Sequence, residues 1–328
     1  MKRKLNNIFF VLLGNRIYFL IGLNILVIII MSMISPYFLN AQNLLGMTRF
    51  GAVLAMVALG ETLVILAGGG GIDLSIGSIL SLSGILFGLI VKSGIPIWVS
   101  ALLAIVIGGL LGALNGLTIA KWGLPPLIGT LGTMYAYGAL ALVLSKGMPI
   151  SGFPKNFSFL GQGVILKIPV QVLLIVIPTF IILQYIASKT HFGRDIYLIG
   201  VNEYAARFAG ISVTKIRFSL YVLDGILASA GAIIMSSYLM TARADVGNGL
   251  ELQAITVAML GGTNIMGGSG SLIGTMLAVL ILTMVASGLQ LANVNTIWQL
   301  AILGLILLTA VAINQAIAIN EAKKQGIA

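Results

Sequence analysis

The stretch "ALLAIVIGGLLGAL", residues 101–114, carries no charge and does not alternate between apolar and polar positions. A membrane-spanning strand alternates with a period of two, whereas a spanning helix needs about 20 predominantly apolar residues. Similar runs, such as "ILVIII" at residues 25–30, recur along the chain. Charged residues make up only 8% of the sequence, against roughly 25% in an ordinary soluble domain. The sequence therefore predicts an all-α, polytopic integral membrane protein.

We expect about ten transmembrane helices with Gly-rich breaks, in one transmembrane domain over residues 1–328. The predicted spans are 17–38, 50–67, 72–91, 97–119, 127–144, 169–187, 217–239, 252–262, 270–289 and 296–314. The eighth is short for a full crossing, so we expect it to be broken or shallow. The basic start "MKRKLNN" is typical of a signal peptide. However, the apolar run after Arg16 is too long and lacks a cleavage site, which predicts an uncleaved first span.

The distribution of Lys and Arg predicts that both termini are cytoplasmic. An even number of spans puts both termini on one side, and cytoplasmic segments carry the excess of basic residues. With the termini inside, twelve basic residues fall in inner segments and six in outer ones. The inner set is Lys2, Arg3, Lys4, Arg16, Lys121, Lys189, Arg194, Arg207, Lys215, Arg217, Lys323 and Lys324, and the outer set is Arg49, Lys92, Lys146, Lys155, Lys167 and Arg243. Topology thus accounts for the net charge of +10 without a nucleic-acid partner.

Two connecting segments are long enough to have a function of their own. The external loop, about 145–168, is rich in Gly and Pro, and the cytoplasmic loop, about 188–216, contains four of the eighteen basic residues. Within the second, "NEYAARFAGI" at residues 202–211 places Ala205, Ala206 and Ala209 beside Tyr204 and Phe208 in a short helical pattern that ends at Gly210. Such a segment either docks on another protein or is a solvated connector, and the spacing does not decide between them.

Several classes of chemistry are excluded by what the sequence lacks. It has no Walker A motif and no G-x-G-x-x-G spacing in a βαβ context, which argues against nucleotide binding. It has no cysteine, so we expect neither disulfides nor a Cys-based metal site. A single histidine, His191 in a polar loop, supplies neither a catalytic triad nor a metal ligand set. We therefore expect no catalytic site, no metal and no enzyme.

The stretch "AGGGGIDLSIGS", Ala67–Ser78, interrupts the apolar pattern with four consecutive glycines. Glycine costs about 1 kcal/mol relative to alanine inside a helix, so this stretch predicts a helix break. Asp73 and Ser75 are then placed to cap the next helix. The other interpretation is that the break lines a transport path or forms a cytoplasmic gate. A second stretch, "MLGGTNIMGGSGSLIGTM" at residues 259–276, has a similar pattern on the same side of the membrane. The candidate break, path or gate residues are Glu61, Gly70, Gly71, Asp73, Ser75, Gly77, Ser78, Gly261, Gly262, Gly267, Gly268 and Gly270.

Three acids fall within or at the edge of predicted spans: Glu61, Asp73 and Asp224. A charge at the bilayer centre costs about 2.5–3.5 kcal/mol on insertion scales, so each acid needs a partner or a function. Glu61 either bonds to neighbouring helices or faces a polar passage. For Asp224 we expect pairing with the nearby inner basic residues, or capping.

Small residues at four-residue spacing predict close helix packing; they are Gly108, Gly112 and Gly116 in one span and Gly270, Gly274 and Ala278 in another.

Three segments together resemble one family. "GGIDLSIGS" at 70–78, "FGRDIYLIGVNEYAARFAGI" at 192–211 and "GLELQAITVAMLGGTNIMGGSGSLIGT" at 249–275 are similar to the permease subunits of ribose-type ABC importers, and the resemblance covers nearly the whole chain. These importers carry monosaccharides such as ribose, galactose, xylose and rhamnose, or the sugar-like autoinducer-2. The resemblance implies a location in the bacterial cytoplasmic membrane. Which substrate this chain serves, and whether it pairs with itself or a sister permease, stays open.

The resemblance also implies partners. Two permease subunits would form the path, a periplasmic or lipid-anchored binding protein would deliver the substrate, and cytoplasmic ATPase subunits would bind the ATP, so the chain needs no cofactor. A cytoplasmic helix of such permeases fits a groove in the ATPase, and here that helix corresponds to residues 202–210. The implied coupling residues are Gly193, Arg194, Asn202, Glu203, Ala205, Ala206, Arg207 and Gly210.

Two other functions compete with this interpretation. A secondary transporter driven by an ion gradient would use Glu61 and Asp73 to carry protons or sodium, and its uptake would persist without ATP. The scarcity of intramembrane acids argues against it. An integral-membrane enzyme would need a nucleophile, metal cluster or cofactor site, and the sequence offers none.

Overall fold

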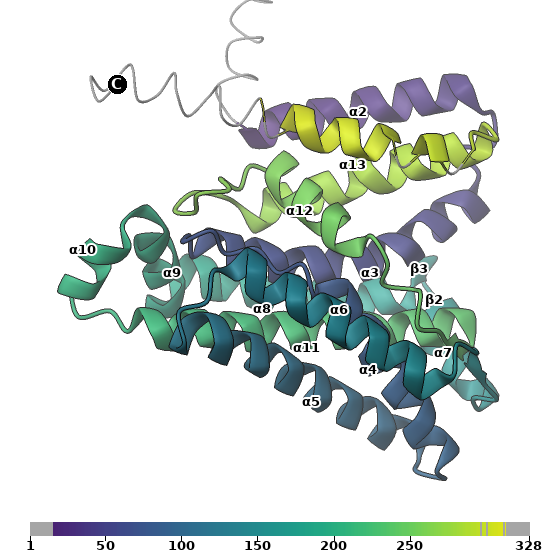
Figure 1. Cartoon of the computed structure of the whole chain (residues 1–328). Helices are drawn as coiled ribbons and strands as arrows, with labels where there is room; N and C mark the ends of the chain where they lie inside the picture. Colours follow the sequence, from purple (N-terminus) through teal and green to yellow (C-terminus); the bar gives the residue numbers. More distant parts are fainter. Residues whose placement is uncertain (1–15, 296, 300, 311, 313–328) are drawn as a thin grey trace, which may run out of the picture.

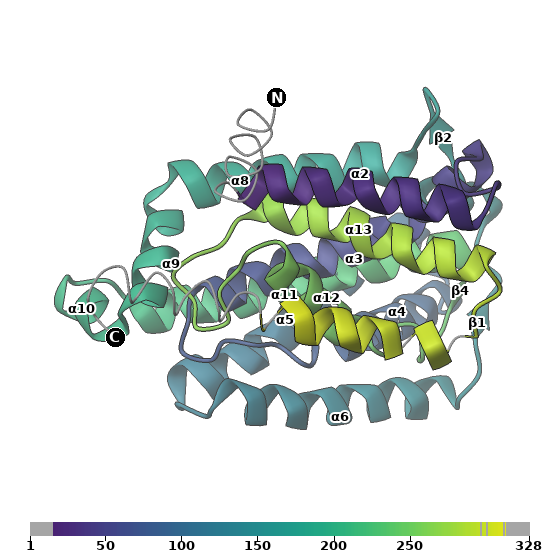
Figure 2. The ribbon, with the colours of Figure 1, turned by 90° about the horizontal axis from the view of Figure 1, so that it is seen from above.

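The structure is a computed structural model that describes residues 16–295, 297–299, 301–310 and 312. It is a bundle of helices whose axes are roughly aligned, with two short helices projecting from one end (Figures 1 and 2). The predicted basic residues Lys2, Arg3, Lys4, Lys323 and Lys324 lie outside the described residues.

Within the described residues, seven helices are long and apolar enough to cross a membrane. They are α2 (Arg16–Ile34), α3 (Ala41–Leu66), α5 (Ile97–Gly116) continued by the π-helical turn η1 (Leu117–Lys121), α6 (Pro126–Ser145), α8 (Ile177–Lys189) preceded by the π-helical turn η3 (Val172–Val176), α11 (Val213–Leu239) and α13 (Leu272–Leu291). Three shorter apolar helices are α4 (Ile76–Lys92), α12 (Leu250–Leu260) and Ile297–Ala310. Seven predicted spans thus contain a helix of full length and three contain a shorter one, so the count of ten crossings stays a prediction.

Helix α3 lies at the centre of the bundle, and every residue from Gly51 to Leu66 is buried. Helices α4, α11, α12 and α13 pack around it. The outer helices instead expose large apolar side chains, such as Leu110, Val143 and Ile181. In a membrane protein such residues contact lipid, because the bilayer core is as apolar as they are.

Glycines bring α5 and α11 close together, as the small-residue spacing predicts. A Cβ at Gly108 or Gly112 would collide with the backbone of α11 at Gly225 or Tyr221, and one at Gly116 would meet Phe218. The second predicted face is only partly correct. Gly274 packs on Gly261 and Ala278 is buried, but Gly270 lies outside the helix, because α13 begins at Leu272 after its N-cap Ser271.

The predicted external loop is folded and not purely helical. It contains η2 (Lys155–Phe157), α7 (Ser158–Gln162), and the strands β1 (Ile150–Ser151), β2 (Val164–Ile165) and β3 (Ile168–Pro169). β2 pairs with β3, and β1 pairs with β4 (Thr241–Ala242). The Ser237 hydroxyl fastens α7 to the end of α11, since it accepts from the Gly161 amide at 2.8 Å and donates to the Phe157 carbonyl at 2.5 Å. The all-α prediction therefore holds for the bundle but misses these short strands. β2 and β3 form a local hairpin, whereas β1 and β4 are far apart in sequence.

Candidate functional site

The connection between α3 and α4 is an irregular segment, residues 67–75. Gly68, Gly69 and Gly70 have φ values of +66°, +66° and +70°. This left-handed region is open to glycine at no steric cost and is unfavourable for other residues. The glycine run therefore reverses the backbone over a few residues, so that α4 starts well inside the bundle.

Four glycines from three segments meet at this connection. A Cβ at Gly68 would touch the backbone of Gly200, and one at Gly267 would collide with the backbone of Gly68. Gly200 is equally enclosed by the backbones of Leu66 and Gly268. The amide of Gly268 donates to the Leu66 carbonyl at 3.0 Å. We call this contact of Gly68, Gly200, Gly267 and Gly268 the glycine junction.

The glycine junction joins the three motifs that carry the family resemblance. Gly68 precedes the first, Gly200 belongs to the second, and Gly267 and Gly268 to the third. The second motif also reaches the third through the Tyr197 hydroxyl, which donates to the Gly270 carbonyl at 3.2 Å. Residues that are widely separated in sequence thus form one packed unit at the end of α3.

The other predicted break residues lie in three places: between α3 and α4, directly after α12, and on α4 itself. Gly71 approaches the Val64 carbonyl, Gly70 has open space around it, and Gly262, with φ +110°, lies against Arg16. Gly261 packs on α13 at Gly274. Gly77 and Ser78 lie on α4, where Gly77 touches the backbone of Gly247 and Ser78 donates to the Ser75 carbonyl at 2.9 Å.

Asp73 ties the broken segment to its surroundings. Its Oδ1 accepts from the Ser75 amide at 2.8 Å and the Ser75 hydroxyl at 2.6 Å, and its Oδ2 accepts from Asn115 of α5 at 3.2 Å. Both carboxylate oxygens of Glu61 accept from the Asp73 amide at 3.2 Å. Asp73 therefore fixes Ser75, the residue that precedes α4. The capping prediction is not confirmed, because no side chain makes a cap hydrogen bond at the N-terminus of α4.

Three further polar residues support this segment and were not singled out from the sequence. Asn115 donates to the Ser75 hydroxyl at 2.6 Å. Tyr137 of α6 donates to Asn115 at 3.4 Å, and Thr130 of α6 donates to the Ile72 carbonyl at 3.2 Å. A lone Asn, Tyr or Thr within an apolar span gives no signal for such contacts, because they depend on how the helices pack.

The expected pairing of Asp224 with inner basic residues is wrong. Asp224 is fully buried, and no ion pair involves it among the described residues. Its carboxyl group lies in the space that Gly60 leaves free, close enough to Asp73 and Glu61 to interact electrostatically, and neither of its oxygens has a hydrogen-bond partner among the described residues. Glu61, Asp73 and Asp224 thus form one buried carboxyl cluster. In the described part of the chain no group of three or more His, Asp or Glu residues is arranged to hold a metal ion.

The predicted cytoplasmic loop forms two helices, α9 (His191–Val201) and α10 (Glu203–Phe208). Gly193 lets α9 pack tightly against the end of α8, because a Cβ there would collide with the carbonyls of Ile186 and Ala187. Arg194 is exposed beside Asp195 and His191. Asn202 caps α10 by accepting from the Ala205 amide at 3.0 Å, and Gly210, with φ +83°, ends it.

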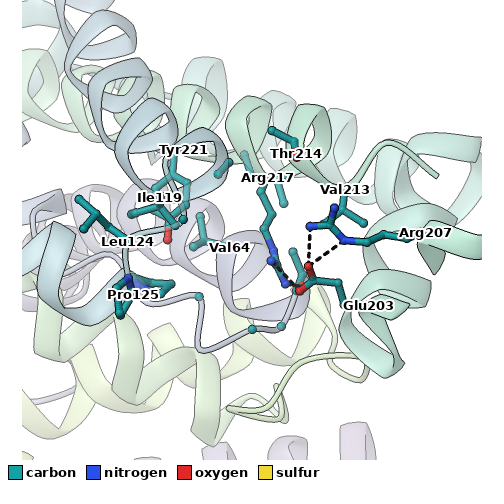
Figure 3. A pocket seen from close by; sticks show the side chains of 18 residues that line it. Val64, Ile119, Leu124, Pro125, Glu203, Arg207, Val213, Thr214, Arg217 and Tyr221 are labelled. Atoms are coloured by element: carbon teal, nitrogen blue, oxygen red, sulfur yellow. Dashed lines mark hydrogen bonds and ion pairs between the residues drawn. The ribbon is translucent and has the colours of Figure 1, made fainter. Parts of the chain in front are cut away.

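An ion-pair network links α10 to the broken segment (Figure 3). Glu203 bonds Arg207 at 2.7 Å and Arg217 of α11 at 2.8 Å. Arg217 lies over Gly69 and donates to the Ala67 carbonyl at 3.4 Å. These residues line a cavity of about 320 Å³ between α10, α11 and η1. Partial burial raises the pKa of Glu203, but the two guanidinium groups outweigh this effect and lower it overall.

Helix α10 also presents an apolar surface to the outside. Tyr204 and Phe208 are 78% and 93% exposed, while Ala206 is buried and Ala205 faces outward. An exposed aromatic pair on a short charged helix is typical of a contact surface for another protein. The arrangement therefore combines an exposed surface, an ion-pair link and a broken helix in one continuous structure.

Comparisons with known proteins assign the chain to a family. Residues 43–311 match the family described as "Branched-chain amino acid transport system / permease component". The ribose import permease protein RbsC of Bacillus subtilis is 41% identical over 297 residues, covering 90% of this chain and 91% of that protein. The autoinducer 2 import system permease protein LsrD of Enterobacter sp. is 38% identical, covering 89% and 90%. RbsC of Escherichia coli K12 is 37% identical, covering 90% and 92%. No solved structure matches the chain significantly.

The fold defines a membrane protein with several helices that are long and apolar enough to span a bilayer, and its relatives are transport components. The chain belongs to the family of transport-system permease components, and it is a permease subunit of an import system in the bacterial inner membrane.

Proposed function

We propose that this chain forms the translocation path of an ATP-driven ABC importer for a monosaccharide or a sugar-like solute such as autoinducer-2. The similarity to ribose and autoinducer-2 import permeases over about 90% of the chain supports this substrate class. ATP would bind to a separate ATPase subunit, so the permease itself carries no cofactor. A periplasmic or lipid-anchored binding protein would deliver the substrate.

The observation that carries the proposal is the link from α10 to the broken segment. In this scheme the ATPase binds α10 at Tyr204 and Phe208. When the ATPase moves, α10 moves with it, and the ion pair between Glu203 and Arg217 transmits this displacement to the glycine turn at Gly69. A packed junction responds to such a push by shifting as a unit, because its backbones touch directly. The path would then open alternately outward and inward.

The same scheme includes ten crossings with both termini in the cytoplasm. The short helices α4 and α12 would complete their crossings with the irregular segments next to them, as in other broken-helix transporters. Arg16, at the start of α2, donates to the Met259 carbonyl near the glycine junction at 3.0 Å. This contact supports a start of α2 on the side that carries α9 and α10.

The first experiment isolates the chain gently from its native membrane and identifies the proteins that accompany it. An ATPase subunit in stoichiometric amount is the expected result, and either a second copy or a sister permease should be present as well. The isolated complex is then placed in liposomes with the binding protein, and uptake of labelled D-ribose, D-galactose, D-xylose, L-rhamnose and autoinducer-2 is measured with and without ATP.

The buried carboxyl cluster is the observation that favours the alternative, an ion-gradient-driven transporter. In that case Glu61 and Asp73 would carry the coupling ion. Uptake would persist without ATP and stop when an uncoupler collapses the gradient. A chain that purifies alone and behaves in this way would overturn the importer proposal.

A further inference from the structure

A second cavity lies away from the glycine junction. It measures about 450 Å³ and is bounded by α3, α12, α13 and the helix Ile297–Ala310. Gln42 and Gln290 line it at the ends of α3 and α13 that are opposite to the junction. Val53 and Leu54, midway along α3, line it as well. The cavity therefore reaches from the outer face to about the middle of the bundle.

Amide side chains are concentrated in this cavity. Four of the nine glutamines in the sequence line it, and they come from four different helices: Gln42, Gln253, Gln290 and Gln299. Asn43 and Ser287 add an amide and a hydroxyl. Convergence of neutral polar groups from four helices is unexpected in an apolar chain unless they share a ligand or solvent.

Three of these amides are available to a ligand. Asn43 donates to the Phe38 carbonyl and accepts from Ser287 at 2.8 Å each, and Gln299 donates to the Val294 carbonyl at 2.9 Å. In contrast, the side chains of Gln42, Gln253 and Gln290 have no hydrogen bond to any described residue. Each free amide offers two donor hydrogens and a carbonyl acceptor.

The side chains that line the cavity indicate which class of ligand it can bind. Among the described residues that line the cavity none is charged, and Phe50 adds an aromatic ring to its wall. Uncharged donors and acceptors suit alternating hydroxyl groups, and an aromatic face suits the C–H groups of a sugar ring. The inner wall, formed by Val53, Leu54, Met235 and Leu282, is apolar and offers a solute no polar partner further in.

We propose that this amide-lined cavity is the outward-facing binding subsite for an uncharged, polyhydroxylated solute in the translocation path. This inference rests on the proposed function and names the residues that hold the solute. Gln253, at the start of the half-length helix α12, and the outer amides Gln42 and Gln290 contact its hydroxyl groups. The apolar inner wall separates the solute from the cytoplasmic half until the bundle rearranges.

A cavity-filling substitution tests the subsite. Gly46 lines the cavity, and a Cβ built on it meets no atom within 4 Å. Gly46→Phe therefore occupies the cavity without a backbone clash. Gly22→Phe is the matched control, because Gly22 lies on the exposed surface of α2 with equally open space. Both variants are assembled with the ATPase and binding protein, and uptake of the sugar that the wild type accumulates fastest is measured beside basal ATPase activity.

We expect Gly46→Phe to lose about tenfold or more of its uptake, as blocking several hydrogen bonds would, in a complex that still assembles with the ATPase and the binding protein. Gly22→Phe should transport like the wild type. Equal uptake by both variants would overturn the subsite while leaving the importer proposal intact. A wild-type complex that transports no sugar with ATP would instead refute the importer proposal, and with it this inference.

Thiol labelling provides a second readout that does not depend on transport rate. The chain has no cysteine, so Ser287→Cys introduces a single thiol into the cavity, and Leu280→Cys places one on the exposed surface of the same helix. We expect a membrane-impermeant methanethiosulfonate, added from outside, to label position 287 and not position 280. The transported sugar should slow labelling at 287. Labelling that the sugar does not affect would contradict the assignment.

Discussion

Glu203 forms ion pairs with two arginines, Arg207 and Arg217. Of the two contacts, the bond to Arg217 connects different elements, because Arg207 is on the same short helix. The sequence singled out Glu203 and Arg207 within one motif, but Arg217 belongs to the following helix and was counted there only as an inner basic residue. Its role depends on the fold, which carries it over Gly69.

Reversing the charge of Glu203 should uncouple the importer. In Glu203→Arg three cations face one another, so the link to Arg217 is lost and the broken segment no longer follows α10. We expect uptake to fall at least about tenfold with normal amounts of the protein in the membrane. The matched double variant Glu203→Arg/Arg217→Glu restores opposite charges and should recover part of the uptake. Normal uptake by the single variant would show that Glu203 has no coupling role.

The pKa of Glu203 predicts how this link responds to pH. Because the pKa is lowered in the folded protein, the stabilisation is fully present above the ordinary glutamate pKa of about 4.3 and is lost as pH falls through the lower folded value. The difference in thermal stability between the wild type and Glu203→Gln should therefore be constant from neutral pH down to about 5 and shrink below that. A difference that already vanishes near neutral pH would contradict the ion pair.

Glu61 is expected to act as an acceptor for the Asp73 amide and not as an ion carrier. Glu61→Gln keeps a carbonyl oxygen that can accept the same hydrogen bond, so ATP-driven uptake should stay within about twofold of the wild type. Glu61→Leu removes the acceptor and leaves a buried donor unpaired, which costs about 1–3 kcal/mol and should lower the amount of folded protein. Complete loss of uptake in Glu61→Gln would favour the ion-gradient alternative.

At the scale of elements, the glycine junction is a contact between backbones and not between side chains. Gly200 lies at the end of α9, and its neighbours are the Leu66 carbonyl and the Gly268 amide. Backbone groups held in two different elements cannot move aside as a flexible side chain would. A single methyl group is therefore enough to separate α9 from the broken segment.

Gly200→Ala should disturb this contact although alanine favours helices. We expect a lower melting temperature, with overpacking costing about 1–3 kcal/mol, and weaker coupling between ATP hydrolysis and uptake. Gly132→Ala on α6 is the control, because a Cβ there meets no atom within 4 Å. Thermal stability and the number of sugars taken up per ATP hydrolysed would be compared. Identical behaviour of the two variants would contradict a packed junction.

At the scale of the whole molecule, the two cavities lie at opposite ends of the central helix α3. One is lined by Val64 near its C-terminal end, and the other begins at Gln42 near its N-terminal end. Between them α3 is buried on all sides from Gly51 onward. This arrangement is consistent with the proposed importer in a state whose path is closed in the middle, with the proposed ATPase contact at one end and the proposed solute contact at the other.

The ATPase should be within cross-linking distance of α10. Phe208 is the most exposed aromatic residue of that helix, and the chain has no other thiol to compete. Phe208→Cys, oxidised in the assembled complex with single cysteines placed along the ATPase groove, should give one dominant disulfide-linked product. Tyr185→Cys on α8, also exposed, serves as the control and should give none. The reverse result would place the ATPase elsewhere.

The sequence by itself determined the membrane location, the helical bundle and the positions of its breaks. Apolar run length and glycine content act locally, through the cost of exposing backbone to lipid and through the φ values that only glycine adopts readily. The helical pattern of residues 202–210 was likewise readable, because a short amphipathic helix is defined by its own spacing. Which of its apolar residues are exposed was not, since Ala206 is buried whereas Tyr204 and Phe208 are exposed.

Only the tertiary structure decided which of these features act together. It showed that Gly68, Gly200 and Gly267 touch, that Asp224 lies close to Asp73 and not to a basic residue, and that glutamines of four helices line one cavity. These partners are separated by many residues along the chain, so no local spacing encodes them. They are fixed by how the helices pack around α3, where close backbone approach and the need to satisfy each buried polar group leave few alternatives.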